Sequence, residues 1–165
     1  MTKEKSWKDR VSPLAIGQIL LMANIVQNIV IQHAATLGWL KYTGAFFILP
    51  IIILWPLPVF TLRKYGNISS SGSFLATTKL VDKGIYKLIR HPQYLSFILL
   101  NAGMAFINQD IITSIISIFS IGFLFAGIKE EEQLMIEQFK NDYSDYMKRV
   151  PSINLFMGLF RLNKR

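Results

Sequence analysis

Four long stretches of this 165-residue chain contain no Asp, Glu, Lys or Arg. They cover residues 11–40, 42–62, 91–109 and 111–128. A helix crosses a bilayer with about 20 mainly apolar residues, within a range of roughly 17–25. Each stretch is long enough for one crossing, so the sequence predicts an all-α, polytopic membrane protein that forms a single domain over residues 1–165. The four expected transmembrane helices lie near residues 13–31, 43–62, 92–107 and 111–128.

The composition argues against the alternative of a soluble helical bundle. Apolar residues make up 52% of the chain and charged residues 17%, whereas soluble domains average about 25% charged residues. The few polar residues between the apolar stretches could not cover four buried helices. The chain also has no cysteine and only two histidines, which excludes a disulfide scaffold, a thiolate zinc site and a cysteine nucleophile. We therefore expect no metal site.

The basic residues lie almost entirely on one side of the expected spans. Four of the 18 Lys and Arg residues precede the first span, six lie between the second and third, and seven follow the fourth, which leaves only Lys41 on the other side. Basic loops stay in the cytoplasm, so we expect an integral multi-pass protein with both termini cytoplasmic. Contact with anionic membrane lipids then explains the net charge of +8. We expect no nucleic-acid partner, and no feature calls for an obligate protein partner.

Prolines mark the second span. Proline inside a helix removes a hydrogen bond and kinks the helix. We expect a bend at Pro50 and a ragged helix end near Trp55, where Pro56 and Pro58 follow closely. After this span, residues 67–73 form a Ser-rich loop, which we interpret as a flexible surface loop, with a gate over a site as the alternative.

The first span carries several amide side chains. Asn24, Gln27 and Asn28 lie on one helical face, with Gln18 and Gln32 nearby. Amides inside a membrane usually form hydrogen bonds with a neighbouring helix, and this is the interpretation we favour. The alternative is that they line a polar pocket.

The segment that enters the third span, residues 80–94, concentrates polar and aromatic groups. Pro92 is suited to a first helical turn, and the residue before a proline is driven away from helical geometry, so we expect His91 to be extended. Arg90, His91 and Tyr94 are then held around a helix N-terminus, where free N–H groups attract carboxylate or phosphate. The alternative is that Arg90 and Tyr94 are ordinary interfacial anchors.

The segment that leaves the fourth span begins with three consecutive glutamates, residues 130–132. Carboxylates at the edge of a bilayer are costly unless they are paired, so we expect a bound cation or Arg90 beside them. Apolar and aromatic residues then recur at helical spacing, which predicts one amphipathic helix that folds back on the bundle or lies along the membrane. That face consists of Met135, Phe139, Tyr143, Tyr146 and Val150.

Together these two segments resemble a known family. The pattern is Gly84-x-Tyr86-x-x-x-Arg90-His91-Pro92-x-Tyr94, a two-helix hairpin, Glu131-Glu132, and Phe139-x-x-x-Tyr143-x-x-Tyr146-x-x-x-Val150-Pro151. It is similar to that of the isoprenylcysteine carboxyl methyltransferase and phospholipid methyltransferase superfamily of integral-membrane enzymes. The resemblance covers about residues 80–151, the expected cofactor-binding region.

The resemblance implies a methyltransferase that uses S-adenosyl-L-methionine and acts on a lipid or a prenylated small molecule at the cytoplasmic face. It places Arg90 and Glu132 nearest the reacting group, as the catalytic pair. It also implies a cofactor pocket shaped by Leu80, Gly84, Tyr86, His91, Pro92, Tyr94 and Glu131.

The residues themselves fit such chemistry. Acidic groups and the faces of Tyr86 and Tyr94 can stabilise the sulfonium cation of this cofactor. A carboxylate acceptor attacks unaided and Arg90 would orient it, whereas an amine acceptor needs a base, for which Glu132 is the candidate. The sequence leaves both acceptors open.

The chain departs from the family pattern in two places, both in the C-terminal tail. Lys140 stands where a glycine usually follows the phenylalanine, and Ile153-Asn154 replaces a usual proline. Two other functions remain open: a membrane oxidoreductase of the steroid-reductase type that uses NADPH, and a membrane protein without enzymatic activity.

Overall fold

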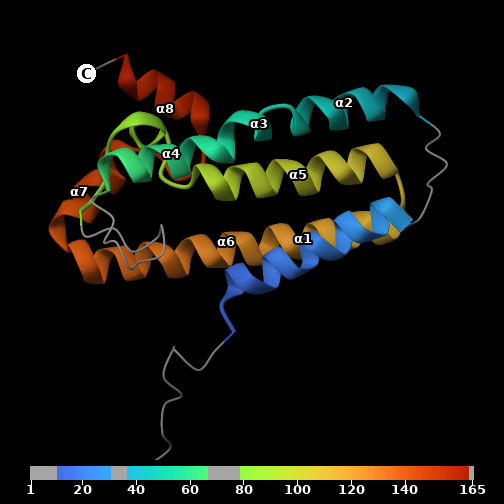
Figure 1. Ribbon diagram of the computed structural model, residues 1–165, viewed down its shortest axis with the longest axis horizontal. Coiled ribbons are helices and arrows are strands. Elements are labelled where there is room, and N and C mark those ends of the chain that lie inside the picture. Colours follow the sequence, from blue (N-terminus) through green and yellow to red (C-terminus); the bar gives the residue numbers. More distant parts are fainter. Residues whose placement is uncertain (1–10, 31–36, 67–78, 164–165) are drawn as a thin grey trace, which may run out of the picture.

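The computed structural model describes residues 11–30, 37–66 and 79–163. Within these ranges every regular element is a helix, which confirms the all-α prediction (Figure 1). The helices are α1 (Pro13–Val30), α2 (Gly38–Ile48), α3 (Ile51–Leu54), α4 (Pro56–Tyr65), η2 (Gly84–Lys87), α5 (Pro92–Asn108), α6 (Ile111–Phe139), α7 (Asn141–Arg149) and α8 (Leu155–Leu162). Gln32 and the Ser-rich loop lie outside the described residues.

Among the residues that the structure describes, three helical stretches are long and apolar enough to cross a membrane: Pro13–Val30, Gly38–Tyr65 and Ile111–Phe139. They correspond to the first, second and fourth expected spans. The third expected span is α5, with 17 residues, or about 26 Å at 1.5 Å per residue, slightly less than a hydrocarbon core of about 30 Å. It lies within the same bundle, alongside α2 and α6 (Figure 1).

The helices form a bundle in which α6 packs against α1 and α5, and α5 packs against α2 and α3. Small residues permit the close crossing of α2 and α5. A Cβ atom on Gly44 would lie only 2.5 Å from the carbonyl oxygen of Gly103. The backbones of the two helices are therefore in direct contact, as is common between membrane helices.

The amides of α1 form hydrogen bonds across the bundle. The Asn24 side chain, which is fully buried, donates to the Oγ of Ser117 at 2.9 Å and to the Oδ1 of Asn101 at 3.3 Å. Asn28 donates to the Oδ1 of Asn108 at 2.7 Å. These contacts confirm the favoured interpretation of the amides. Gln18, one of the nearby amides, instead lines the cavity described below.

In the second span, the expected bend is confirmed, and the expected helix end is present only as an interruption. The chain bends at Pro50, because α2 ends at Ile48 and α3 begins at Ile51. The helix is interrupted at Trp55, between the end of α3 at Leu54 and the start of α4 at Pro56, but it does not end there. The prolines at positions 56 and 58 occupy the first turn of α4, where an N–H group has no helical partner to lose, so the helix continues to Tyr65.

The prediction of one continuous helix after the glutamates was also wrong. Helix α6 ends at Phe139, and Lys140 adopts a positive φ of 50° with ψ of −123°, which breaks the helix before α7 begins. The expected apolar face survives the break. Tyr143, Tyr146 and Val150 are buried and pack with Met135, Phe139 and Leu80. The turn therefore folds α7 back on the bundle.

Candidate functional site

A cavity of about 220 Å³ lies at the end of the bundle where α5 begins. Residues from α1, α4, η2, α5, α6 and α7 line it, so it is enclosed by segments far apart in the sequence. Seven of the nine predicted site residues line this cavity: Leu80, Tyr86, Arg90, His91, Pro92, Tyr94 and Glu131. Gly84 and Glu132 do not line it.

The local sequence explains how these residues reach the cavity. Pro92 occupies the first turn of α5, as predicted. His91 is non-helical, as expected before a proline, but its φ of −122° and ψ of 63° are not those of an extended residue, so that part of the prediction was wrong. Gly84 begins the short η2 helix with a positive φ of 58°, and a Cβ atom there would lie 2.8 Å from Cγ2 of Thr61. Gly84 therefore shapes the turn against α4 rather than the cavity wall.

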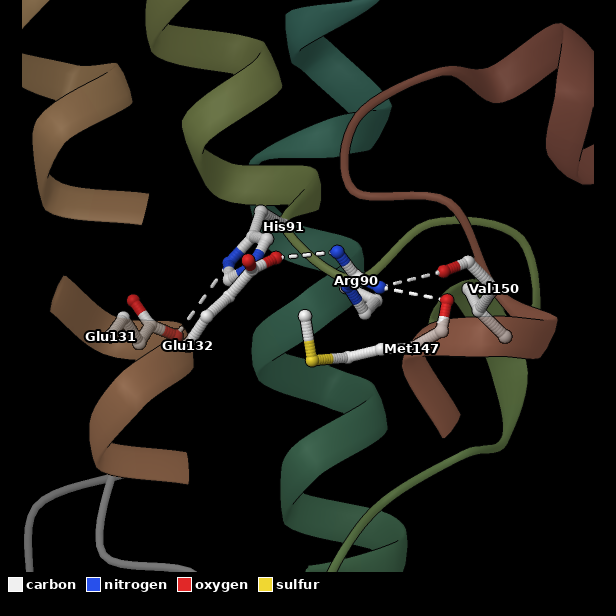
Figure 2. A network of polar contacts seen from close by, with 6 residues as sticks. All are labelled: Arg90, His91, Glu131, Glu132, Met147 and Val150. Carbon is white, nitrogen blue, oxygen red and sulfur yellow. Dashed lines mark hydrogen bonds and ion pairs between the residues drawn. The ribbon is translucent and has the colours of Figure 1, made fainter. Parts of the chain in front are cut away.

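Behind the cavity, Glu132 joins the two residues that precede α5 (Figure 2). Its Oε1 accepts a hydrogen bond from Nη2 of Arg90 at 2.5 Å and lies 3.1 Å from Nε2 of His91. The side chains of Arg90 and Glu132 are only 8% and 16% exposed. The expectation that a glutamate at this depth pairs with Arg90 is thus confirmed.

Arg90 also binds the C-terminal part of the chain. Its Nη1 donates to the carbonyl oxygens of Met147 and Val150, each at 3.0 Å (Figure 2). Its backbone N–H donates to the carbonyl oxygens of Pro151 and Ser152. One arginine therefore joins the start of α5, the end of α7 and α6. No sequence signal marks these carbonyl partners, because every residue has a carbonyl group.

His91 is deeply buried in the cavity wall, with a side chain 2% exposed. Its Nδ1 lies 3.8 Å from Oε1 of Glu131 and has no hydrogen-bond partner among the described residues. The Tyr94 ring meets the imidazole edge-on, with centroids 5.5 Å apart. A buried ring nitrogen without a partner is costly, so the cavity offers this atom to a polar ligand.

Four tyrosines line the cavity. Besides Tyr86 and Tyr94, these are Tyr143 and Tyr146, whose ring centroids are 5.7 Å apart. The Tyr146 hydroxyl donates to the carbonyl oxygen of Tyr86 at 2.7 Å, and burial raises its pKa above the ordinary value. Sequence reasoning placed Tyr143 and Tyr146 on a packing face but missed them as site residues. The signal that could have identified them was their helical spacing, which places them on the same face as Met135 and Phe139.

Leu14 and Gln18 of α1 also line the cavity and were not predicted. They lie near the start of the first span, far in sequence from the two segments that carry the motif. Ser12, just before α1, donates to Oε2 of Glu130 at 3.0 Å. The start of α1 is therefore held against the glutamate segment of α6, which explains how it reaches the cavity.

Comparison with known proteins identifies the family of this chain. Residues 43–137 match the isoprenylcysteine carboxyl methyltransferase family. The chain is 27% identical over 128 residues to protein-S-isoprenylcysteine O-methyltransferase of Mus musculus, covering 77% of this chain and 45% of the relative. It is 31% identical over 100 residues to protein-S-isoprenylcysteine O-methyltransferase B of Arabidopsis thaliana, covering 55% and 51%.

The chain thus spans about half the length of the curated relatives it matches. No solved structure matches it significantly. The family match covers more than half of the chain and includes the start of α5 and the glutamates of α6. This protein therefore belongs to the isoprenylcysteine carboxyl methyltransferase family.

Proposed function

We propose that this protein transfers a methyl group from S-adenosyl-L-methionine to the carboxylate of a lipid-like, prenylcysteine-type acceptor. The observation that carries the proposal is the cavity at the start of α5, where Glu131, His91 and four tyrosines converge within or beside the family-matching region. The relatives are named as isoprenylcysteine O-methyltransferases, which supports the same acceptor class here.

The residues of the cavity fit the cofactor. S-adenosyl-L-methionine supplies a methyl group bound to a positively charged sulfur. The Glu131 carboxylate attracts a cation, and the faces of Tyr86 and Tyr94 add cation–π stabilisation. The unpartnered Nδ1 of His91 is available for a polar group of the same molecule. These residues would hold the cofactor, and the apolar walls would exclude water from the reaction.

Arg90 and Glu132 would have different roles in the reaction. Arg90 lines the cavity, and its Nε has no hydrogen-bond partner among the described residues, so this atom would orient the acceptor carboxylate. Glu132 lies behind Arg90 and pairs with it, so it acts through Arg90 as a positioning residue. A carboxylate already committed to Arg90 and His91 is a poor proton acceptor for an amine. This arrangement supports a carboxylate acceptor over an amine. Positioning of the reactants alone can contribute roughly 7–11 kcal/mol.

We further propose that the cavity opens at the cytoplasmic face. Lys129, Lys140 and Lys148 lie at this end of the bundle, on α6, α7 and the turn between them. Basic residues accumulate on the cytoplasmic side of membrane proteins. A water-soluble cofactor would then enter from the cytoplasm. A reporter fused after Arg165 that gives a signal on the opposite side of the membrane would contradict this orientation.

The proposal is tested with the purified full chain in lipid vesicles, supplied with methyl-labelled S-adenosyl-L-methionine. A prenylcysteine analogue with a free carboxylate is compared with phosphatidylethanolamine, which offers an amine. We expect label in the prenylcysteine product only, released as methanol by alkali because a methyl ester is base-labile. Alkali-stable label in phosphatidylethanolamine would show an amine acceptor. If calorimetry showed binding of NADPH but not of S-adenosylhomocysteine, the protein would be an oxidoreductase and the methyltransferase proposal would be wrong.

A further inference from the structure

Helix α8 has its apolar side turned away from the rest of the described protein. Phe156 is 85% exposed, and Met157 and Leu159 are also exposed. The inner side is packed: Leu155 contacts the cluster around Leu54, and Gly158 is buried. A helix on the surface of a soluble protein carries polar residues outward, so α8 has the opposite arrangement.

We propose that α8 is an interfacial membrane helix whose outer face, Phe156, Met157 and Leu159, inserts into an anionic phospholipid leaflet on the cavity side of the bilayer. Neither the family match, which ends at residue 137, nor the cavity accounts for this helix. The proposal concerns how the C-terminal segment binds lipid and does not depend on methyl transfer.

The position of α8 supports a lipid environment. Leu155, its first residue, packs against a cluster that contains Leu54, and Leu54 belongs to the second membrane-spanning stretch. The helix therefore begins beside a residue of a span and lies at the same end of the bundle as α4 and α7 (Figure 1). The inner side of α8 is therefore packed against a membrane-spanning stretch, which keeps the outer face close to the bilayer.

The charges around α8 identify the kind of lipid. From residue 146 to the end, the sequence contains no Asp or Glu but five basic residues: Lys148, Arg149, Arg161, Lys164 and Arg165. Basic groups next to an apolar helical face are typical of helices that bind anionic membrane surfaces. Neither a neutral leaflet nor a generic apolar protein surface would explain why all the charged residues of this segment are positive.

Helix α8 is also held in a fixed orientation. The Asn154 side chain accepts a hydrogen bond from the N–H of Met157 at 2.9 Å and caps the first turn. Gly158 lies so close to Leu88 that a Cβ atom would approach the Leu88 carbonyl oxygen to 2.1 Å. Arg161 donates to the carbonyl oxygen of Lys148. With its inner side fixed by these contacts, α8 keeps its outer side directed toward the surroundings.

The experiment uses single-cysteine variants, which are unambiguous because the chain has no native cysteine. Phe156→Cys in the full chain is labelled with an environment-sensitive fluorophore and reconstituted in vesicles. Asp145→Cys, at a side chain 66% exposed on α7, is the matched control. Quenching by brominated acyl chains reports lipid contact, and quenching by iodide reports water contact. Vesicles of phosphatidylcholine alone are compared with vesicles that also contain phosphatidylglycerol.

We expect several-fold stronger quenching by brominated lipid at position 156 than at position 145, the reverse order for iodide, and deeper insertion when phosphatidylglycerol is present. Iodide quenching at position 156 equal to that at 145 would overturn the proposal. Protection from both quenchers would also overturn it, because a second copy or another protein would then cover the face. Equal insertion in the two lipid mixtures would refute the anionic preference.

Discussion

The guanidinium of Arg90 and the carboxylate of Glu132 meet at 2.5 Å and join the start of α5 to α6. The same guanidinium donates to the carbonyl oxygens of Met147 and Val150 at the end of α7. Three segments that enclose the cavity are therefore held by one side chain. A buried arginine in this position determines the shape of the site as well as its charge.

Arg90→Lys tests this dual role. Lysine keeps the positive charge but lacks the planar fork that reaches three acceptors. We expect methyl transfer to fall at least tenfold and the free energy of unfolding to fall by about 1–3 kcal/mol. Initial rates and thermal unfolding in detergent measure the two effects. Arg149→Lys, at an exposed arginine that donates to the carbonyl oxygen of Asp145, should change neither. Wild-type rates and stability in Arg90→Lys would refute the role.

Glu131→Gln tests whether the carboxylate in the cavity stabilises the sulfonium. S-adenosyl-L-methionine carries the positive charge, whereas S-adenosylhomocysteine lacks it. We expect the dissociation constant of the first to rise roughly tenfold and that of the second to rise much less. Calorimetric titration of both ligands measures the difference. Glu130→Gln is the matched control, because Glu130 binds Ser12 and does not line the cavity. Equal losses for both ligands would exclude charge recognition by Glu131.

The sequence predicted those parts of the fold and site that follow from local rules. Charge-free runs identified the first, second and fourth spans because bilayer thickness sets a minimum helix length. The non-helical His91 followed from the steric effect of Pro92 on the preceding residue. The pairing of Glu132 followed from the cost of a buried carboxylate. In each case one physical requirement acts on a few neighbouring residues.

The rest depended on contacts between segments far apart in the chain. Tyr143 and Tyr146 reach the cavity only because the helix breaks at Lys140, and a lysine gives no signal for a positive φ. The continuation of the second span past Trp55 depended on where the prolines fall within a turn. Helix α8 was missed because its eight residues are too few for periodicity to stand out.

Asn24→Ala measures the polar contact between α1 and its neighbours. The substitution removes the hydrogen bonds to Asn101 and Ser117. Such bonds inside membranes contribute about 0.6 kcal/mol on average and up to about 2 kcal/mol. We expect a loss of stability in that range, detected by unfolding in detergent. Met22→Ala, at a side chain 62% exposed on the same helix, should have a smaller effect. An equal effect of both would show that Asn24 contributes packing alone.

Lys140→Gly should stabilise the protein. Lys140 has a positive φ of 50°, a conformation that costs a residue with a side chain about 1–3 kcal/mol and glycine little. Part of this gain is lost to the greater flexibility of unfolded glycine, so we expect a net gain of about 1 kcal/mol. Glu137→Gly, at an exposed position within α6, should instead destabilise by about 1 kcal/mol. Thermal unfolding of both variants tests this expectation. If both substitutions destabilised the protein, the proposed backbone strain at Lys140 would be contradicted.

Gly158→Ala should disturb the site from outside it. The added Cβ atom would approach the Leu88 carbonyl oxygen to 2.1 Å, so α8 must move away. The segment that leads into α8 supplies the Pro151 and Ser152 carbonyls that accept from the backbone of Arg90. We expect a loss of about 1–3 kcal/mol in stability together with slower methyl transfer. Gly122→Ala is the control, because nothing lies within 4 Å of its added Cβ atom, and alanine favours the helix by up to about 1 kcal/mol. Unchanged stability and rate in Gly158→Ala would show that α8 shifts without moving Arg90, and would separate this helix from the site.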